Sequence, residues 1–177
     1  MQQRITALVV MGVTACGKST IAEAIARRAG AVHIEGDQFH GSANIEKMRS
    51  GQPLTDEDRA GWLARLGEEL AAAVRAGQRP VLSCSALKRR YRDQLRAAVP
   101  GLGFVFLDLD PDEVRRRVSA RQGHFMSLEL VDSQFATLER PSDEPAVLTV
   151  DATLPIAAIS RQAVAWWRAE GGLDDAD

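Results

Sequence analysis

Apolar and polar positions along this chain alternate in blocks, with short runs of branched residues followed by longer amphipathic stretches. The first run, residues 5–11 (ITALVVM), has the length and composition of a strand that is buried on both faces. Apolar residues then recur at helical spacing from Ile21 to Ala29, and Gly30 supplies a stop signal. The chain is therefore predicted to begin with a strand, a glycine-containing turn and a helix.

The same alternation continues to the end of the chain. Further strands are predicted over residues 31–34, 79–83, 103–109 and 147–150. Helices are predicted over residues 56–76, 88–98, 112–121, 128–138 and 156–169, with a short helix over residues 44–48. Strands that alternate with helices indicate an α/β fold, here a five-stranded, mainly parallel sheet with helices on both faces. The 177 residues contain no internal repeat or linker, which predicts a single domain over residues 1–177 with an acidic tail over residues 171–177.

Composition narrows the class of protein further. Hydrophobic residues make up 45% of the chain and charged residues 26%, as in ordinary globular proteins. The net charge of −2 gives no reason to expect nucleic acid or an anionic membrane as a partner, and no apolar run reaches the ~20 residues of a membrane span. Cys16 and Cys84 form no CxxC pair, and the histidines add no zinc-binding spacing. These features predict a cytoplasmic protein with free thiols.

The turn after the first strand carries a phosphate-binding motif. Residues 12–19 (GVTACGKS) follow the pattern G-x-x-x-x-G-K-[ST], in which glycines let the backbone point its N–H groups at phosphate oxygens. Lys18 is expected to reach the β- and γ-phosphates, and the Ser19 hydroxyl is expected to ligate Mg²⁺. The flanking strand and helix are the context that this motif requires. The predicted nucleotide-binding residues are Gly12, Val13, Thr14, Ala15, Cys16, Gly17, Lys18, Ser19 and Thr20.

A bacterial lipoprotein signal is a second interpretation of the same residues. Arg4, an apolar stretch and residues 13–16 (VTAC) would leave a lipidated Cys16 at the new N-terminus after cleavage. Cleavage would also remove the first strand and half of the phosphate loop. Residues 17–20 (GKST) and the helix behind them would then be unexplained, so we favour the phosphate loop.

Polar clusters follow three of the predicted strands: the phosphate loop, residues 35–40 and residues 83–88. In an open parallel sheet the carboxyl ends of the strands share one crevice, so these clusters are expected to converge there. Asp37 is placed to orient an acceptor hydroxyl and accept its proton, although capping of a turn beside Gly36 would also explain it. Glu35 is a weaker candidate for holding Mg²⁺ through water.

Cations at the start of the helix over residues 88–98 need an explanation. Lys88, Arg89 and Arg90 lie at a helix N-terminus, where positive charge opposes the helix dipole. An anionic ligand would account for them, and so would a solvated basic surface. The sequence leaves these two alternatives open.

A second group of cations lies on the helix over residues 112–121. Arg115, Arg116, Arg117 and Arg121 precede a glycine-containing connection that could close as a lid over a transferring phosphoryl group. Arginines on such a segment would stabilise the negative charge that phosphoryl transfer spreads. A salt-bridged surface helix is the alternative.

Six segments together resemble the gluconokinase (gluconate kinase) family, in the shikimate-kinase-like branch of P-loop small-molecule kinases. They are MGVTACGKST, GDQFH, NIEKM, GQPLTDEDR, CSALKRRYRDQLR and RQGHFM…LVDSQFATLERP, which together extend over residues 11–141. The phosphate loop is widespread among proteins, whereas CSALK with YRD and GHFM with SQF are far more selective. The resemblance implies a P-loop NTPase fold of the nucleoside-monophosphate-kinase-like type, with a lid over about residues 117–130.

The resemblance also implies an activity, which is ATP-dependent phosphorylation of D-gluconate at its 6-hydroxyl to give 6-phosphogluconate and ADP. The implied cofactors are ATP and Mg²⁺, with Ser19 on the metal, and a homodimer is a common assembly of the family. Asp37 would be the base, Lys18 and Arg121 would stabilise the transferring group, and Arg117 and Arg121 would contact the nucleotide. The residues implied for binding gluconate are Asp37, His40, Arg59, Lys88, Arg92, His124 and Gln134.

Two other functions are alternatives to this one. A related P-loop kinase could act on another small acceptor such as shikimate, and only the acceptor distinguishes it. A GTPase switch would need the guanine-specific N-K-x-D motif, but Asn44, the single asparagine of the chain, is followed by Ile45. The sequence therefore favours a small-molecule kinase over a switch.

Overall fold

One parallel sheet organises the protein, whose computed structural model describes residues 3–121 and 128–174. The sheet has five strands in the order β2-β3-β1-β4-β5, and all of their pairings are parallel. The strands are β1 (Ala7–Met11), β2 (Val32–Glu35), β3 (Pro80–Ser83), β4 (Leu102–Asp108) and β5 (Val147–Asp151). The predicted α/β fold with a five-stranded sheet is confirmed, and each strand lies close to its expected bounds.

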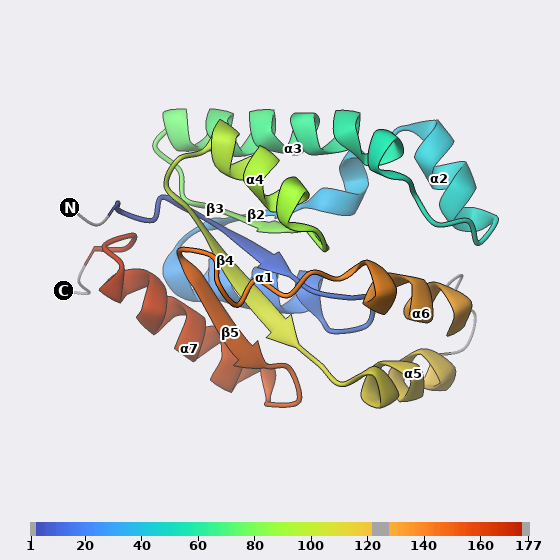
Figure 1. Ribbon diagram of the computed structural model, residues 1–177. Helices are drawn as coiled ribbons and strands as arrows, with labels where there is room; N and C mark the ends of the chain where they lie inside the picture. Colours follow the sequence, from blue (N-terminus) through green and yellow to red (C-terminus); the bar gives the residue numbers. More distant parts are fainter. Residues whose placement is uncertain (1–2, 122–127, 175–177) are drawn as a thin grey trace.

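Helices cover both faces of the sheet (Figure 1). On one face α1 (Lys18–Ala29) packs beside α7 (Ile156–Ala169), and on the other α3 (Asp56–Arg75) packs beside α4 (Arg89–Ala98). No helix within the described residues is both long enough and apolar enough to cross a membrane.

Three helices extend past the carboxyl ends of the strands (Figure 1). They are α2 (Ser42–Arg49), α5 (Pro111–Ala120) and α6 (Leu128–Thr137), and α2 is longer than the predicted short helix. A 3₁₀ turn that the sequence did not predict, η1 (Gly36–Phe39), follows β2 directly. These segments surround the edge of the sheet where the polar clusters were expected to meet.

The central strand β1 is buried on both faces, so it holds the phosphate loop on a rigid base. Successive side chains of a strand point to opposite faces, and here Leu8 and Val10 join the core with α1 and α7. Val9 and Met11 join the other core, with α3 and α4. This two-sided burial explains why the strand Ala7–Met11 is apolar at every position.

Candidate active site

The loop between β1 and α1 turns tightly enough to direct its amides inward. The backbone φ angles of Gly12, Ala15 and Gly17 are all positive, at 151°, 60° and 91°. A Cβ on Gly12 would lie 2.8 Å from Cys16 Sγ and 3.1 Å from the carbonyl oxygen of Leu107, so a larger residue does not fit. Successive inward N–H groups at the start of a helix form a cradle for phosphate. The geometry therefore fits the nucleotide polyphosphate that the motif predicts.

Lys18 reaches back across this loop. Its Nζ donates to the carbonyl oxygen of Val13 at 2.9 Å and lies 4.0 Å from Cys16 Sγ. A phosphate oxygen is a stronger, charged acceptor than this carbonyl, so the ammonium is available to a bound nucleotide. The thiol of Cys16 is buried in the core with α1 and α7.

A cavity of about 350 Å³ lies beside the phosphate loop, between η1, α2, the start of α3 and α6. The structure brings several predicted site residues together around it, namely Thr14, Lys18, Asp37, His40, Arg59 and Gln134. Its apolar lining comes from α2, the segment before α3, and α6, through Ile45, Met48, Pro53, Leu54 and Leu130. The mixture of a few polar groups with an apolar wall is typical of a small-molecule site.

Sequence reasoning missed several polar residues of this cavity. Arg49, Gln52, Ser133 and Thr137 also line it, whereas Ser85 comes from the predicted cluster over residues 83–88. Ser133 and Thr137 are four positions apart on α6, and the hydroxyl of Thr137 donates to the carbonyl oxygen of Ser133 at 2.8 Å. Their helical spacing next to Gln134 was the available signal. Arg49 ends α2 in a polar stretch and carried no comparable signal.

Asp37 and His40 are close in sequence but have different surroundings. The side chain of Asp37 is 79% exposed, whereas that of His40 is 3% exposed, and the two lie 4.0 Å apart from Oδ1 to Nε2. The His40 ring stacks on Trp62 with 4.0 Å between centroids. Burial lowers the pKa of His40, the charge of Asp37 raises it, and that of Arg59 lowers it. His40 is therefore a neutral hydrogen-bonding group at neutral pH, beside an open carboxylate.

One hydrogen bond and one close backbone approach hold η1 in place. The Trp62 Nε1–H donates to the carbonyl oxygen of Gly36 at 2.8 Å. A Cβ on Gly36 would lie 2.4 Å from the carbonyl oxygen of Ser83, which would force β2 and β3 apart. The glycine before Asp37 therefore serves close packing, and it fixes where the carboxylate enters the cavity.

Arg59 enters the cavity from the first turn of α3. A capping box starts this helix, in which Thr55 Oγ1 accepts from the backbone N–H of Asp58 at 3.1 Å and Asp58 Oδ2 accepts from that of Thr55 at 2.8 Å. Arg59 Nη1 donates to the carbonyl oxygen of Leu54 at 2.6 Å and to the Tyr91 hydroxyl at 3.1 Å. A planar guanidinium held in this way can bind a carboxylate with two hydrogen bonds.

Lys88 lies beside the cavity and is not among its described lining residues. Its Nζ donates to Asp56 Oδ1 at 2.9 Å, and Arg90 Nη1 donates to Asp56 Oδ2 at 2.9 Å. The hydrogen bond from Tyr91, followed by that from Lys88, lowers the pKa of Asp56 to about 2. The anion that accounts for Lys88 and Arg90 in this structure is therefore a carboxylate of the protein itself.

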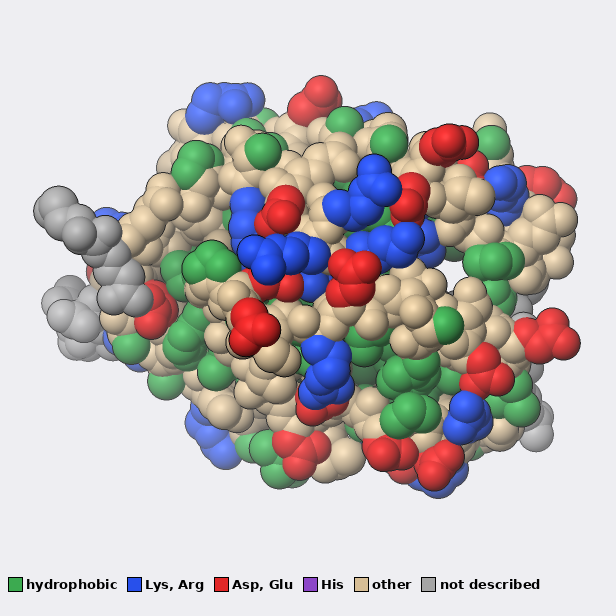
Figure 2. Space-filling model, viewed as in Figure 1, with side chains coloured by type: hydrophobic (Ala, Val, Ile, Leu, Met, Phe, Trp, Pro, Cys, Tyr) green, Lys and Arg blue, Asp and Glu red, His purple; other side chains and the backbone are tan. Residues whose placement is uncertain are grey.

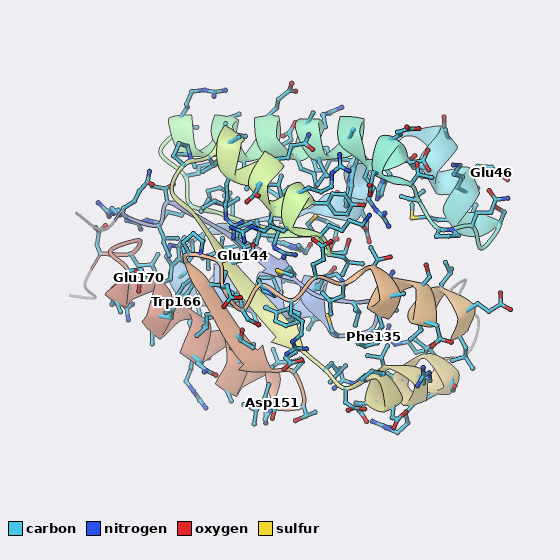
Figure 3. The ribbon with its side chains drawn as sticks, viewed as in Figure 1. Glu46, Phe135, Glu144, Asp151, Trp166 and Glu170 are labelled. Carbon is cyan, nitrogen blue, oxygen red and sulfur yellow. The ribbon has the colours of Figure 1, made fainter. Side chains whose placement is uncertain are left out.

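Arg92, which was predicted to contact gluconate, is paired within the protein in this structure. Its side chain is fully buried and bonds to both Glu144 oxygens at 2.8 and 2.6 Å. It also donates to the carbonyl oxygens of Ala86 and Glu139, each at 2.7 Å. Every guanidinium nitrogen thus has a protein acceptor. Glu144, labelled in Figure 3, reaches Arg92 from the segment between α6 and β5.

The arginines of α5 divide between the two alternatives left open by the sequence. Arg115 pairs with Asp132 at 2.6 Å and Arg116 pairs with Glu113 at 2.6 Å, as expected for a salt-bridged surface. Arg117 also pairs with Glu113, at 3.1 Å, but it donates in addition to the carbonyl oxygens of Ala15 and Ala152, each at 3.2 Å, and so lies against the phosphate loop.

The rest of the predicted lid is only partly described. Arg121 is exposed at the end of α5. His124 and the connection over residues 122–127 lie outside the described residues. Gln134, on α6 beyond that connection, accepts a hydrogen bond from the backbone N–H of Thr14 at 2.6 Å. This bond joins α6 directly to the phosphate loop.

Ser19 and Glu35 are the two residues that the sequence assigns to Mg²⁺, and they come from α1 and β2. Ser19 lies in the first turn of α1, and Glu35 ends β2 opposite Ser83 of β3. The described residues contain no cluster of three or more His, Cys, Asp or Glu side chains around one point. Mg²⁺ usually takes one or two protein ligands and completes its shell with water and phosphate, so Ser19 with Glu35 suits that mode of binding.

The parallel sheet, the phosphate loop after its central strand and the cavity beside that loop define a P-loop kinase. The family described as "AAA domain" matches residues 8–141. A gluconokinase from Gluconobacter oxydans (strain 621H) is 50% identical over 143 residues, which cover 81% of this chain and 80% of that relative. The chain belongs to the gluconokinase family.

Two further relatives agree with this assignment. The thermoresistant gluconokinase of Escherichia coli (strain K12) is 42% identical over 152 residues, which cover 85% of this chain and 87% of that relative. The crystal structure of a gluconokinase from Sinorhizobium meliloti 1021 matches with a TM-score of 0.85 at 46% identity, covering 94% of each chain.

Proposed function

We propose that this protein is a gluconokinase, which transfers the γ-phosphoryl group of ATP to the 6-hydroxyl of D-gluconate and releases 6-phospho-D-gluconate and ADP. One observation carries the proposal. The phosphate loop with Lys18, the open carboxylate of Asp37 and the guanidinium of Arg59 all face one cavity of about 350 Å³. The 50% identity with a gluconokinase supports this choice of acceptor.

The phosphate end of the cavity handles the transferring group. Backbone amides of the phosphate loop and Lys18 bind the ATP polyphosphate, and Lys18 with Arg121 stabilises charge on the γ-phosphoryl group as it transfers. Ser19 and, through water, Glu35 would hold Mg²⁺, which would neutralise phosphate charge there. Asp37 orients the acceptor hydroxyl and accepts its proton, a role suited to its exposure to the cavity.

The acceptor end recognises an open-chain acid. In D-gluconate the carboxylate and the 6-hydroxyl lie at opposite ends of the molecule, so a cation is needed away from the phosphate loop. Arg59 supplies it from α3, and His40 and Gln134 bind hydroxyls from neighbouring positions around the cavity. His124 completes the set as predicted from the sequence.

We also propose the setting in which this reaction takes place. The chain acts as one domain over residues 1–177, in the cytoplasm, with residues 117–130 as the lid. Its ligands are ATP, Mg²⁺ and D-gluconate, without nucleic acid or membrane as a partner, and it assembles as a homodimer.

A panel of acceptors tests the function. Purified protein is mixed with ATP, Mg²⁺ and one acceptor, and ADP release is followed by a coupled assay. We expect turnover with D-gluconate and none above the acceptor-free rate with shikimate or adenylylsulfate. Turnover with shikimate and not with gluconate would assign the protein to the alternative acceptor.

A further inference from the structure

The position of Arg59 in the cavity depends on Leu54, which lines the cavity, and on Tyr91, which is not among the described residues that line it. Its Nη1 donates to the Tyr91 hydroxyl at 3.1 Å and to the carbonyl oxygen of Leu54 at 2.6 Å. Its Cζ also lies 5.3 Å from the centroid of the Tyr91 ring, within the range of a cation–π contact. A free arginine side chain samples many rotamers, so these contacts select the one that is observed.

Tyr91 connects Arg59 to a carboxylate. A phenolic oxygen donates one hydrogen bond and accepts others, and Tyr91 donates to Asp56 Oδ1 while it accepts from Arg59. Burial, and then the hydrogen bond to Asp56, raises the pKa of Tyr91, so its hydroxyl keeps its proton at neutral pH. Asp56, Tyr91 and Arg59 thus form one hydrogen-bonded chain from α3 to α4 and back.

Two cations fix the far end of this chain. Lys88 binds Asp56 Oδ1 and Arg90 binds Oδ2, both at 2.9 Å. Figure 2 shows Lys and Arg side chains interleaved with Asp and Glu over the middle of the face that carries α4. Because Asp56 starts α3 three residues before Arg59, an anchored Asp56 lies on the same side of the helix as Arg59.

We propose that Asp56 and Tyr91 are positioning residues for the acceptor: their hydrogen bonds hold the Arg59 guanidinium where it meets the acceptor's carboxylate. The inference rests on the proposed function, because it takes that carboxylate to be the acid group of gluconate. A guanidinium already in place binds the anion without losing side-chain freedom at that moment. Lys88 then acts on the acceptor through Asp56, so Lys88→Ala raises the KM for gluconate more than the KM for ATP.

Tyr91→Phe is the sharpest test, because it removes one hydroxyl and keeps the ring under Arg59. We expect the KM for gluconate to rise about tenfold, the scale of one hydrogen bond to a charged group. The KM for ATP and kcat should stay within about twofold of wild type, as for a loss of uniform acceptor binding. Arg89→Gln is the matched control, because the exposed Arg89 side chain pairs with Asp93 on the same helix and with neither Asp56 nor Arg59, and its KM for gluconate should stay within about twofold.

A double-mutant cycle separates positioning from general damage. In an Arg59→Gln background, Tyr91→Phe should no longer change kcat/KM for gluconate, because the two residues act as one unit. Additive effects, or equal rises in both KM values, would overturn the inference. If the wild-type protein phosphorylates gluconate and Tyr91→Phe leaves the KM for gluconate unchanged, the positioning inference is wrong and the proposed function stands. Wild-type protein that fails to phosphorylate gluconate would overturn the proposed function as well.

Discussion

At the scale of single residues, the cavity sets an open carboxylate beside a buried, neutral imidazole. Asp37 is exposed because η1 carries it past the end of β2, whereas His40 at the end of the same turn packs on Trp62. The exposed acid can reach an incoming hydroxyl, and the fixed ring can only offer or accept a hydrogen bond. Their different surroundings suit Asp37 for proton transfer and His40 for orientation.

Asp37→Asn keeps the shape of this group and removes its ability to accept a proton. We expect kcat to fall by about 10²- to 10⁴-fold, the range of general base catalysis, with ATP binding unchanged in calorimetry. Asp143→Asn is the control, because Asp143 is an exposed carboxylate outside the cavity. Unchanged turnover in Asp37→Asn would remove Asp37 from the mechanism.

Arg92 is a second residue to consider at this scale, because its sequence position did not indicate that it would be buried and paired with a carboxylate. Its guanidinium is fully buried against Glu144, which is itself 3% exposed. Arg92→Ala leaves Glu144 with Arg96 as its remaining cation, at 2.9 Å. We therefore expect the free energy of unfolding to fall by about 3 kcal/mol, the lower end of the range for breaking a buried ion pair. Urea denaturation measures this loss, with Arg89→Ala, at an exposed position of the same helix, as the control. A destabilisation equal to that of the control would show that the pair is not important for stability.

At the scale of elements, α6 and the phosphate loop are linked by one hydrogen bond. Gln134 Oε1 accepts from the backbone N–H of Thr14 at 2.6 Å, and both residues line the cavity. Arg117 braces the loop from α5 through the carbonyl oxygen of Ala15 at 3.2 Å. The loop is thus held from two helices, α5 and α6, whose adjoining ends belong to the predicted lid over residues 117–130.

Gln134→Leu tests this link with little change in side-chain volume. We expect kcat/KM for ATP to fall about three- to tenfold, as for the loss of one neutral hydrogen bond. Gln162→Leu, on the exposed side of α7, should leave it unchanged. Equal values for Gln134→Leu and wild-type protein would separate α6 from nucleotide binding.

The start of α3 makes the protein sensitive to acid. The hydrogen bond from Lys47, and then that from the Thr55 backbone, lowers the pKa of Asp58 from 3.8 to about 2. A carboxyl whose pKa is lower in the folded state stabilises the fold above its unfolded pKa, and that stability is lost as pH falls from about 4 toward 2. Melting temperatures over this range should therefore fall less steeply in Asp58→Asn than in wild-type protein. Parallel curves for the two proteins would contradict this role.

At the scale of the whole molecule, the pattern of apolar positions was sufficient for the sheet and its helices. The phosphate loop was also predictable, because its residues are contiguous and its flanks are local. Contacts between distant segments were not predictable. Lys88 meets Asp56, 32 residues away, and Arg92 meets Glu144, 52 residues away. Whether such a cation binds a substrate or a protein carboxylate is decided by tertiary packing, which periodicity does not encode.

The most direct measurement of the central claim is identification of the product. Wild-type protein is incubated with ATP, Mg²⁺ and D-gluconate, and the products are assayed for ADP and, with 6-phosphogluconate dehydrogenase and NADP⁺, for 6-phosphogluconate. We expect equal amounts of ADP and 6-phosphogluconate. ADP formed at the acceptor-free rate, with no 6-phosphogluconate detected, would contradict the assignment of this chain as a gluconokinase.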